Sequence, residues 1–394
     1  MTPSDGQRFV IVGAGRQGTA CAAFLLEQFA TTTVDLVDVA AERLATAQKL
    51  LGHAERVRTR QMDVAADAGE ARAVFAGAAC VVSCVPYFLN VGLTRSALAA
   101  KVPFTDLGGN VGTVRDQLAL DSECRQAGVA LAPDCGLAPG LLNVLAEYWQ
   151  GDWDYKAVRL YCGGLPQNPR GLLKYALTFN VCGLLNEYLD DCEVSRGGRL
   201  ETVPGMGELE TLSDLALPGE FEAFATSGGA SLGAKLYAAR GVDYQYKTIR
   251  HPGHRDIIVS MQEQGFFDTE PQAFALNGAT VAAVPRDWSG QVMARSMPSD
   301  GKDLVVARVD VSATRAGQRV RGRIDLIDYA VDRFTAMERT TGFPTAVTAA
   351  ALGGLYPDCA IAPGAYVPLQ IIPPALMIRE LARGGIAGIT VREL

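Results

Sequence analysis

The feature that most constrains this chain is the segment from Arg8 to Thr19, RFVIVGAGRQGT, where a short apolar run leads into a glycine-rich turn. Phe9 to Val12 are aromatic or β-branched and do not alternate with polar residues, which is typical of a parallel strand buried on both faces. The small and apolar residues after Gly18 predict a closely packed helix. A strand, a glycine turn and a helix in this order favour a parallel α/β fold.

The glycine-rich turn has the pattern of a dinucleotide-binding loop. Gly13 would make the tight turn, Gly15 would let the backbone approach a pyrophosphate, and Gly18 would let the helix lie close to the strand. The anion would then sit at the positive end of the helix dipole. Gln17 and Arg16 are further expected cofactor contacts, and Arg16 could face either the pyrophosphate or a 2′-phosphate.

A second apolar strand, residues 33–37, leads to Asp38. This spacing suits a carboxylate that accepts hydrogen bonds from both hydroxyls of a ribose. Because an acid there would repel the 2′-phosphate of NADP, NAD is the expected cofactor and NADP the less favoured one. The alternative is a structural strand–turn–helix that binds no nucleotide.

Composition narrows the class of protein. With 394 residues, 48% hydrophobic and 20% charged, the chain reads as a globular enzyme of about two domains. Its net charge of −7 argues against nucleic acid as a partner. No run reaches membrane-spanning length and MTPSDGQR is unlike a signal peptide, so a cytoplasmic protein is expected. The scattered cysteines and the three histidines predict no metal site.

Later strand ends bring polar residues to the carboxyl edge of the same sheet, where open α/β sheets bind their ligands. Asp63 is expected near the adenine, and the loop that contains Cys84 and Pro86 near the nicotinamide. The following loops would deliver residues for substrate binding and catalysis, namely Tyr87, Asp106, Asp134 and Cys135.

The regular alternation of predicted strands and helices ends at about residue 140. Residues 1–140 predict a Rossmann domain with a doubly wound parallel sheet, and residues 141–344 predict an α+β domain with a mixed sheet for substrate binding and oligomerisation. Residues 345–394 are expected to return to the Rossmann domain. Short strands of the middle domain could pair two subunits, so a homodimer or larger homo-oligomer is expected.

Five ordered blocks resemble the saccharopine dehydrogenase superfamily, and specifically its lysine 6-dehydrogenase branch: DLGGN, PDCGLAPGLLNVLA, GGLPQNPRGLLKYALTFNVCGLLNEY, YKTIRHPGH and FTAMERTTGFPTA. The likeness covers nearly the whole chain. It implies an NAD(P)-binding Rossmann domain, a central substrate and oligomerisation domain, and oxidative deamination of the ε-amine of L-lysine. The product would be 2-aminoadipate 6-semialdehyde, which cyclises to 1-piperideine-6-carboxylate.

Such a reaction needs a proton acceptor, because hydride leaves the carbon next to a neutral amine and a lysine ammonium has a pKa of about 10.4. An alkaline rate optimum is therefore expected. Asp106 and Asp134 are the carboxylates best placed to hold the amine and later guide water to the imine, although Asp134 could instead cap a turn or helix. Cys135 could line the nicotinamide pocket or be a buried inert thiol.

The substrate carboxylate needs a cation, and residues 247–255 form the densest basic stretch of the second domain. Arg250 and His254 are favoured, with Arg170 and Lys174 as the second choice. Two other functions stay open. One is a saccharopine-type opine dehydrogenase, and the other is a sensor or scaffold that binds NAD without turnover.

Overall fold

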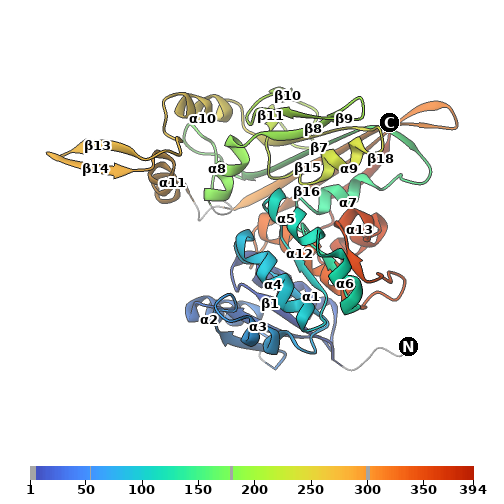
Figure 1. The fold of residues 1–394 in the computed structure, drawn as a ribbon. Coiled ribbons are helices and arrows are strands. Elements are labelled where there is room, and N and C mark those ends of the chain that lie inside the picture. Colours follow the sequence, from blue (N-terminus) through green and yellow to red (C-terminus); the bar gives the residue numbers. More distant parts are fainter. Residues whose placement is uncertain (1–5, 54, 178–180, 299–301) are drawn as a thin grey trace.

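Two domains lie one above the other in the computed structural model, which describes residues 6–53, 55–177, 181–298 and 302–394 (Figure 1). Within these residues the first domain has a seven-stranded, wholly parallel sheet in the order β17-β6-β5-β4-β1-β2-β3. This is the doubly wound order with its switch point between β1 and β4, where ligands bind in such sheets. Its strands are β1 (Arg8–Val12), β2 (Thr33–Asp38), β3 (Val57–Gln61), β4 (Cys80–Ser83), β5 (Phe104–Asp106), β6 (Ala130–Ala132) and β17 (Gly364–Ala365).

Helices cover both faces of this sheet, which explains the unbroken apolar run of β1. Phe9 and Ile11 belong to one buried cluster, and Val10 and Val12 belong to another. The helices of this part are α1 (Arg16–Gln28), α2 (Ala41–Leu51), α3 (Ala68–Phe75), α4 (Asn90–Ala99), α5 (Val111–Leu118) and α6 (Asp121–Ala127), with a short 3₁₀ helix η1 (Tyr87–Leu89).

The second domain is built on a mixed sheet of nine strands among the described residues. β12 and β7 pair in parallel, whereas the other pairs are antiparallel. The strands are β7 (Asp154–Pro166), β8 (Cys192–Arg196), β9 (Arg199–Val203), β10 (Glu210–Leu212), β11 (Phe221–Ala225), β12 (Asp243–Arg250), β15 (Asp303–Arg315), β16 (Gln318–Tyr329) and β18 (Ile389–Glu393).

Helices and one hairpin complete the second domain. The hairpin of β13 (Gln272–Leu276) and β14 (Ala279–Ala283) projects from its side (Figure 1). The helices between β6 and β15 are α7 (Leu141–Ala146), α8 (Val181–Leu189), α9 (Gly233–Ala238), α10 (His254–Glu263) and α11 (Pro285–Ser296).

The last part of the chain connects the domains in a way that differs from the expected boundaries. The return to the Rossmann domain begins with α12 (Ala336–Leu352), before residue 345, and β17 then extends the parallel sheet. After α13 (Pro374–Arg383), however, β18 pairs with β16 of the second sheet. The assignment of all of residues 345–394 to the first domain was therefore wrong for β18. Ile389 and Val391 of β18 pack against the hydrophobic core that both domains share. This packing favours the pairing of β18 with the edge strand β16.

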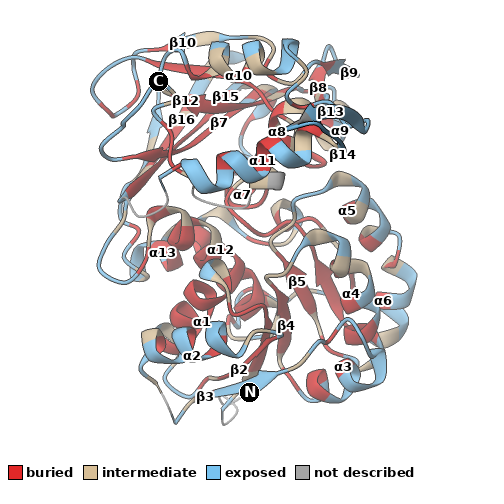
Figure 2. Cartoon of the chain, turned by 90° about the vertical axis from the view of Figure 1, so that its left-hand side faces the viewer, coloured by how far each residue is buried: buried red, intermediate tan, exposed pale blue. Residues whose placement is uncertain are grey.

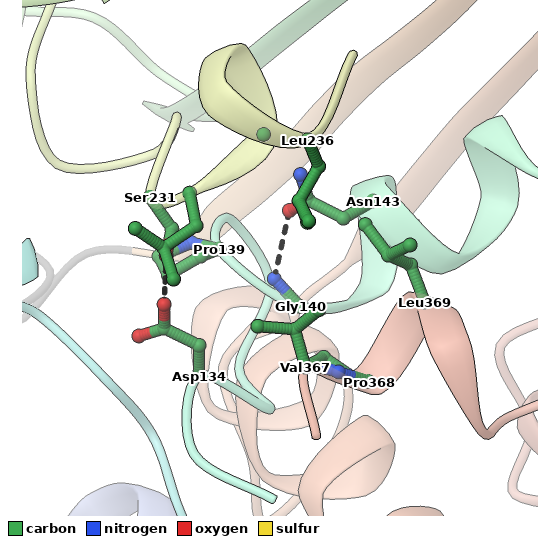
Figure 3. Close-up of a pocket in the computed structure, with 11 residues that line it drawn as sticks. Asp134, Pro139, Gly140, Asn143, Ser231, Leu236, Val367, Pro368 and Leu369 are labelled. Atoms are coloured by element: carbon green, nitrogen blue, oxygen red, sulfur yellow. Dashed lines mark hydrogen bonds between the residues drawn. The ribbon is translucent and has the colours of Figure 1, made fainter. Parts of the chain in front are cut away.

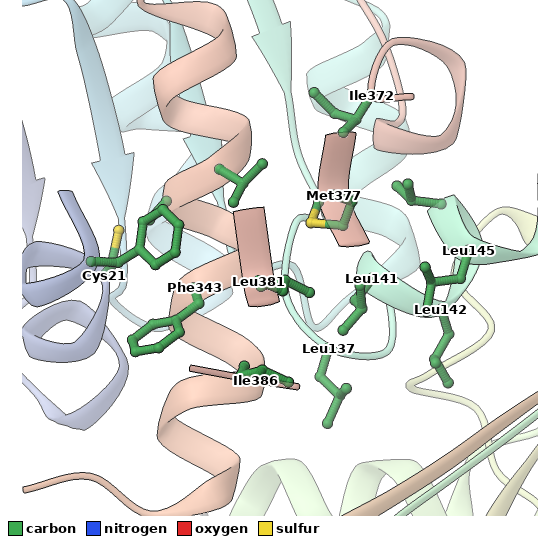
Figure 4. Packing of buried hydrophobic residues seen from close by; sticks show 14 of the residues in the cluster. Cys21, Leu137, Leu141, Leu142, Leu145, Phe343, Ile372, Met377, Leu381 and Ile386 are labelled. Atoms are coloured by element: carbon green, nitrogen blue, oxygen red, sulfur yellow. The ribbon is translucent and has the colours of Figure 1, made fainter. Parts of the chain in front are cut away.

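The largest hydrophobic cluster runs through both domains and is centred on α12 (Figures 2 and 4). Phe343 of α12 packs against Phe24 of α1. Met377 and Leu381 of α13 lie between α12 and α7 (Figure 4). α12 is buried along nearly its whole length, so its small residues let neighbours approach closely. A Cβ on Gly342 would lie 2.8 Å from the Gln17 carbonyl oxygen. α12 thus fixes the position of α1 and of the glycine turn.

We predict that Gly342→Ala lowers the apparent free energy of unfolding by about 1–3 kcal/mol, because the added methyl group overpacks the contact between α12 and α1. The matched control is Gly92→Ala in α4, where nothing lies within 4 Å of the added Cβ. That change should be stabilising by roughly 0.5–1 kcal/mol, because alanine favours helix. Urea unfolding followed by circular dichroism measures both. Equal effects at the two positions would contradict the packing argument.

Candidate functional site

The glycine turn lies between β1 and α1, next to the switch point of the sheet. Gly13 has a positive φ of 101°, and a Cβ there would lie 2.7 Å from the Cys84 carbonyl oxygen. A Cβ on Gly18 would overlap the Gly13 carbonyl oxygen. Around Gly15, in contrast, nothing lies within 4 Å of where a Cβ would be. Gly13 thus makes the tight turn, and Gly18 lets the helix pack closely against it. Gly15 leaves open space beside the backbone.

That open space coincides with the positive end of α1. Gly15 is the N-cap of this 13-residue helix, no side chain caps it, and its first turn has no acidic residue. The backbone amides and the dipole of α1 are therefore suited to a negatively charged group. These residues fit the pyrophosphate of a dinucleotide.

Arg16 and Gln17 lie at the start of α1 and face the domain junction. The Arg16 side chain is half exposed and its Nε lies 3.7 Å from Oε1 of Glu338 on α12. The basic side chain beside Asp38 is Arg43, whose Nη1 lies 4.0 Å from Asp38 Oδ2. Arg43 is therefore better placed than Arg16 to contact a 2′-phosphate on a ribose held by Asp38.

Asp38 ends β2 and ties it to the glycine turn. Its Oδ2 accepts a hydrogen bond from the Ala14 amide at 2.9 Å, and its Oδ1 accepts one from the Ala40 amide at 2.8 Å. Each carboxylate oxygen keeps a further lone pair, so the ribose contact stays a prediction. Asp63 is exposed and accepts a hydrogen bond from the Ala65 amide at 3.0 Å. It stabilises a turn, and its adenine contact also stays a prediction.

The loop after β4 leaves the sheet beside the glycine turn. Cys84 is half-buried there, and burial raises the pKa of its thiol to about 12, so the thiol is protonated. Pro86 is exposed and precedes η1, where the half-exposed Tyr87 ring makes an edge contact with Phe88 at 5.9 Å between centroids. Tyr87 is therefore available to a ligand at this edge.

Asp106 is buried and serves the structure of the site. Its carboxylate accepts hydrogen bonds from the Gly108 amide at 2.8 Å, the Asp134 amide at 3.1 Å and the Gln117 side chain at 2.7 Å. These partners fix the ends of β5 and β6 relative to each other. Oδ1 accepts two of these hydrogen bonds and Oδ2 accepts only one, so the expected contact of Asp106 with the amine stays a prediction; sequence reasoning missed Gln117.

Asp134 lies where the two domains meet (Figure 3). It is 2% exposed, and its Oδ2 accepts a hydrogen bond from Ser231 Oγ of the second domain. Its Oδ1 has no hydrogen-bond partner among the described residues. Burial raises the pKa of this carboxyl to about 7, and the nearby Asp106 charge acts in the same direction. Asp134 can therefore gain or lose a proton near neutral pH, beside a small cavity that it shares with Ser231 and Asn143.

Cys135 is an inert buried thiol. Its Sγ lies 3.2 Å from the Ala132 carbonyl oxygen, to which it donates, and burial raises the pKa of the thiol well above its usual range. Its own carbonyl oxygen accepts a hydrogen bond from Thr345 of α12 at 2.8 Å. The structure therefore does not support a catalytic role for Cys135, since the side chain points into the protein.

Arg250 is the buried cation of the second domain that has no ion-pair partner among the described residues. It is 4% exposed. Its Nε donates to Tyr188 Oη at 2.7 Å, its Nη1 donates to the Ile249 carbonyl at 2.9 Å, and its guanidinium lies over the Tyr175 ring at 4.8 Å. Burying a guanidinium without a direct carboxylate partner is costly, so the site favours an anion.

His254 supports Arg250 but is not a cation. Its Nδ1 lies 2.9 Å from the Leu173 carbonyl oxygen and its Nε2 lies 3.1 Å from Tyr188 Oη. Burial lowers the pKa of His254 to about 3, with the Arg250 charge acting in the same direction. The neutral ring thus donates through Nδ1 and accepts through Nε2. The structure does not support direct pairing of His254 with a carboxylate, and assigns it to the positioning of Tyr188.

The second-choice cation and the residues that sequence reasoning missed lie around Arg250. Lys174 is exposed and its Nζ donates to the Pro252 carbonyl at 3.3 Å, so its substrate contact stays a prediction. Glu187 on α8 was missed, although it is a lone acid in the apolar helix VCGLLNEYL. Burial raises its pKa to about 7, against the lowering effect of Arg250. The Ser231 contact with Asp134 could not be read from the sequence, since 97 residues separate the two.

No cluster of three histidine, cysteine or acidic side chains in the described part of the chain has metal-binding geometry. None of the helices in that part is long and apolar enough to span a bilayer.

We predict that Asp134→Asn changes how stability depends on pH. An unfolded aspartate loses its proton near pH 3.8, whereas Asp134 in the folded protein keeps it up to about pH 7. Wild-type stability should therefore fall as pH rises between these values, and the variant should lack this part of the loss. Relative to wild type, the variant should gain about 2–4 kcal/mol between pH 4 and pH 8. Urea unfolding measures this, with the exposed Asp152→Asn as the control; parallel curves for Asp134→Asn and wild type would contradict the assignment.

Comparisons with known proteins agree with this geometry. Residues 9–131 match the saccharopine dehydrogenase NADP binding domain, and residues 136–386 match the saccharopine dehydrogenase C-terminal domain. The fold is similar to that of apo saccharopine dehydrogenase (L-Glu forming) from Saccharomyces cerevisiae, with a TM-score of 0.76, 18% identity and coverage of 99% of each chain.

A curated relative is similar over a shorter stretch. Alpha-aminoadipic semialdehyde synthase from Arabidopsis thaliana is 24% identical over 178 residues, which are 41% of this chain and 16% of that protein. The match thus spans a small part of that relative's length. The two domain models together account for both domains seen here. The chain belongs to the saccharopine dehydrogenase family.

Proposed function

We propose that this protein is an NAD-dependent dehydrogenase that oxidatively deaminates the ε-amine of L-lysine, or of a close ω-amino acid. The product would be 2-aminoadipate 6-semialdehyde, which cyclises to 1-piperideine-6-carboxylate. Family membership supports an amino-acid oxidoreductase. The observation that carries the finer proposal is the number of buried cations left without a counter-ion in the second domain.

The buried cations of the described chain are Lys247, Arg250, Arg308 and Arg339. Lys247 pairs with Glu210, Arg308 with Asp214 and Asp325, and Arg339 with Asp328. Arg250 alone among them has no carboxylate partner in the part of the chain that the structure describes. A single available guanidinium suits a substrate with one carboxylate.

Asp134 is the proposed acid–base group. A carboxylate of ordinary pKa would accept a proton from a lysine ammonium at a cost of about 9 kcal/mol, and one with a pKa near 7 at about 5 kcal/mol. The burial of Asp134 therefore removes nearly half of this barrier, and alkaline solution supplies the rest. Once this proton has passed to the solvent, the carboxylate would be free to accept a second proton from the water that attacks the imine.

A bound nicotinamide dinucleotide would supply the hydride acceptor. Gly13, Gly15 and Gly18 would form its pyrophosphate cradle with the amides of α1, and Asp38 would hold the adenosine ribose. We favour NAD because the Asp38 carboxylate would repel a 2′-phosphate, although the matched family model is described as NADP binding. Arg43 beside Asp38 is the residue that would oppose this preference.

A saccharopine-type opine dehydrogenase is the second candidate. It is favoured by the names of the yeast enzyme and the Arabidopsis relative to which the chain is similar. Saccharopine has three carboxylates, so it would need more cations than Arg250 offers. Binding of NAD without turnover, as in a sensor or scaffold, is the third candidate, and a buried carboxyl with a pKa near neutrality argues against it.

We predict that the protein reduces NAD in the presence of L-lysine and not with saccharopine or 2-aminoadipate, with a rate that rises from neutral to alkaline pH. Absorbance of the reduced cofactor follows the reaction, with ornithine as the shorter homologue and NADP as the alternative cofactor. Turnover of saccharopine alone would move the function to the second candidate. No turnover of any of them, together with measurable NAD binding, would favour the third.

We predict that Asp38→Ala weakens NAD binding by roughly 1.5–3 kcal/mol, because a charge-assisted hydrogen bond to the ribose is lost. The same change should reduce the difference in binding affinity between NAD and NADP, because it removes the charge that repels the 2′-phosphate. Calorimetric titration with both cofactors measures this. Asp67→Ala is the control, since Asp67 is the exposed N-cap of α3. An unchanged affinity for NAD in Asp38→Ala would refute the ribose assignment.

A further inference from the structure

Glu187 is a half-buried acid near the end of α8 whose charge has no direct partner. Its carboxylate accepts no hydrogen bond and forms no ion pair with any residue that the structure describes. Its side chain is nevertheless held in place: a Cβ on Gly228 would lie 2.5 Å from Glu187 Cγ and 2.9 Å from its Oε1. The Ser227 amide also donates to the Glu187 carbonyl oxygen at 3.0 Å. A fixed acid of this kind can bind a cation that comes from a ligand.

Arg250 is close enough to Glu187 for each charge to influence the other. The two side chains nevertheless do not form an ion pair, and the guanidinium instead contacts Tyr188 and the Ile249 carbonyl. Because Tyr188 is the next residue after Glu187, the acid and the guanidinium belong to the same region of the second domain, and neither has a direct ion-pair partner among the described residues. This charge pattern complements an α-amino-acid head group, which carries one ammonium and one carboxylate.

The loop of residues 226–231 connects this pair to the proposed acid–base group. Gly228 packs on Glu187, and Ser231 donates a hydrogen bond to Asp134. Three residues of chain span at most about 10 Å, so the two carboxylates flank the same short loop. A substrate with two amines on a short chain could place one amine at each of these carboxylates.

We propose that Glu187 and Arg250 form the subsite for the substrate head group, with Glu187 binding the α-ammonium and Arg250 the α-carboxylate. The enzyme would then select diamino monocarboxylic acids over amines that lack either group. This inference rests on the proposed oxidation of an ω-amine at Asp134.

The test compares three amines in the presence of NAD: L-lysine, 6-aminohexanoate, which lacks the α-amine, and 1,5-diaminopentane, which lacks the carboxylate. For the wild-type protein, kcat/KM should be at least 100-fold higher for lysine than for either analogue. Glu187→Gln should lower kcat/KM for lysine about 100-fold, mainly through KM, and change the value for 6-aminohexanoate less than threefold. Glu187→Asp should recover part of the loss. Glu263→Gln, an exposed acid at the end of α10, is the matched control and should behave as wild type.

The wild-type comparison alone can overturn the proposal, even where a variant fails to fold: equal turnover of lysine and 6-aminohexanoate excludes recognition of the α-amine. Lysine turnover with unchanged selectivity in a folded Glu187→Gln variant would overturn the assignment to Glu187 and leave the proposed function standing. Oxidation of saccharopine with no oxidation of any ω-amine would overturn the proposed function, and this subsite with it. Calorimetric titration of lysine into the protein with NADH bound gives an independent measure of the head-group contacts.

Discussion

The packing of α12 against α1 is the contact on which the rest of this structure depends. α12 leaves the second domain, and the missing side chain of Gly342 lets it lie against the Gln17 carbonyl of α1. The same helix donates a hydrogen bond from Thr345 to the Cys135 carbonyl, beside Asp134. One buried helix therefore fixes both the glycine turn and the strand end that carries the proposed acid–base group. Its buried surroundings resist small rearrangements, since protein interiors are close-packed.

Burial decides which polar residues are available for chemistry. Asp106 and His254 are as deeply buried as Asp134 and Arg250, but their polar atoms have partners within the protein. Asp134 and Arg250 keep capacity for a ligand because their neighbours satisfy them only in part. Glu187 belongs to the same class. The three residues come from distant parts of the chain. The loop of residues 226–231 contacts both Asp134 and Glu187, and Arg250 at the end of β12 contacts Tyr188, the residue after Glu187.

The sequence predicted the parts that depend on local pattern. The non-alternating run of β1, the glycine turn and Asp38 at the end of β2 predicted the Rossmann domain with its parallel sheet, and five ordered blocks predicted the superfamily, which the domain models confirm. It was less successful with single side chains. Cys135 follows Asp134 directly, yet Asp134 contacts Ser231 of the second domain and Cys135 contacts the Ala132 carbonyl within the first. The sequence predicted His254 as a cation for the substrate carboxylate, whereas its ring is enclosed by Leu173 and Tyr188.

The sequence by itself determined the fold class and the cradle for a dinucleotide, because strand burial, glycine geometry and the end of β2 are set by neighbours within a few residues. Only the tertiary structure decided which ionisable groups carry an unmatched charge. That property depends on partners far apart in the chain, such as Ser231 for Asp134 and Tyr188 for Arg250, and on the water that packing removes from around them. Desolvation is a property of the assembled domains, so no local pattern could have shown that Asp134 and Glu187 have pKa values near 7.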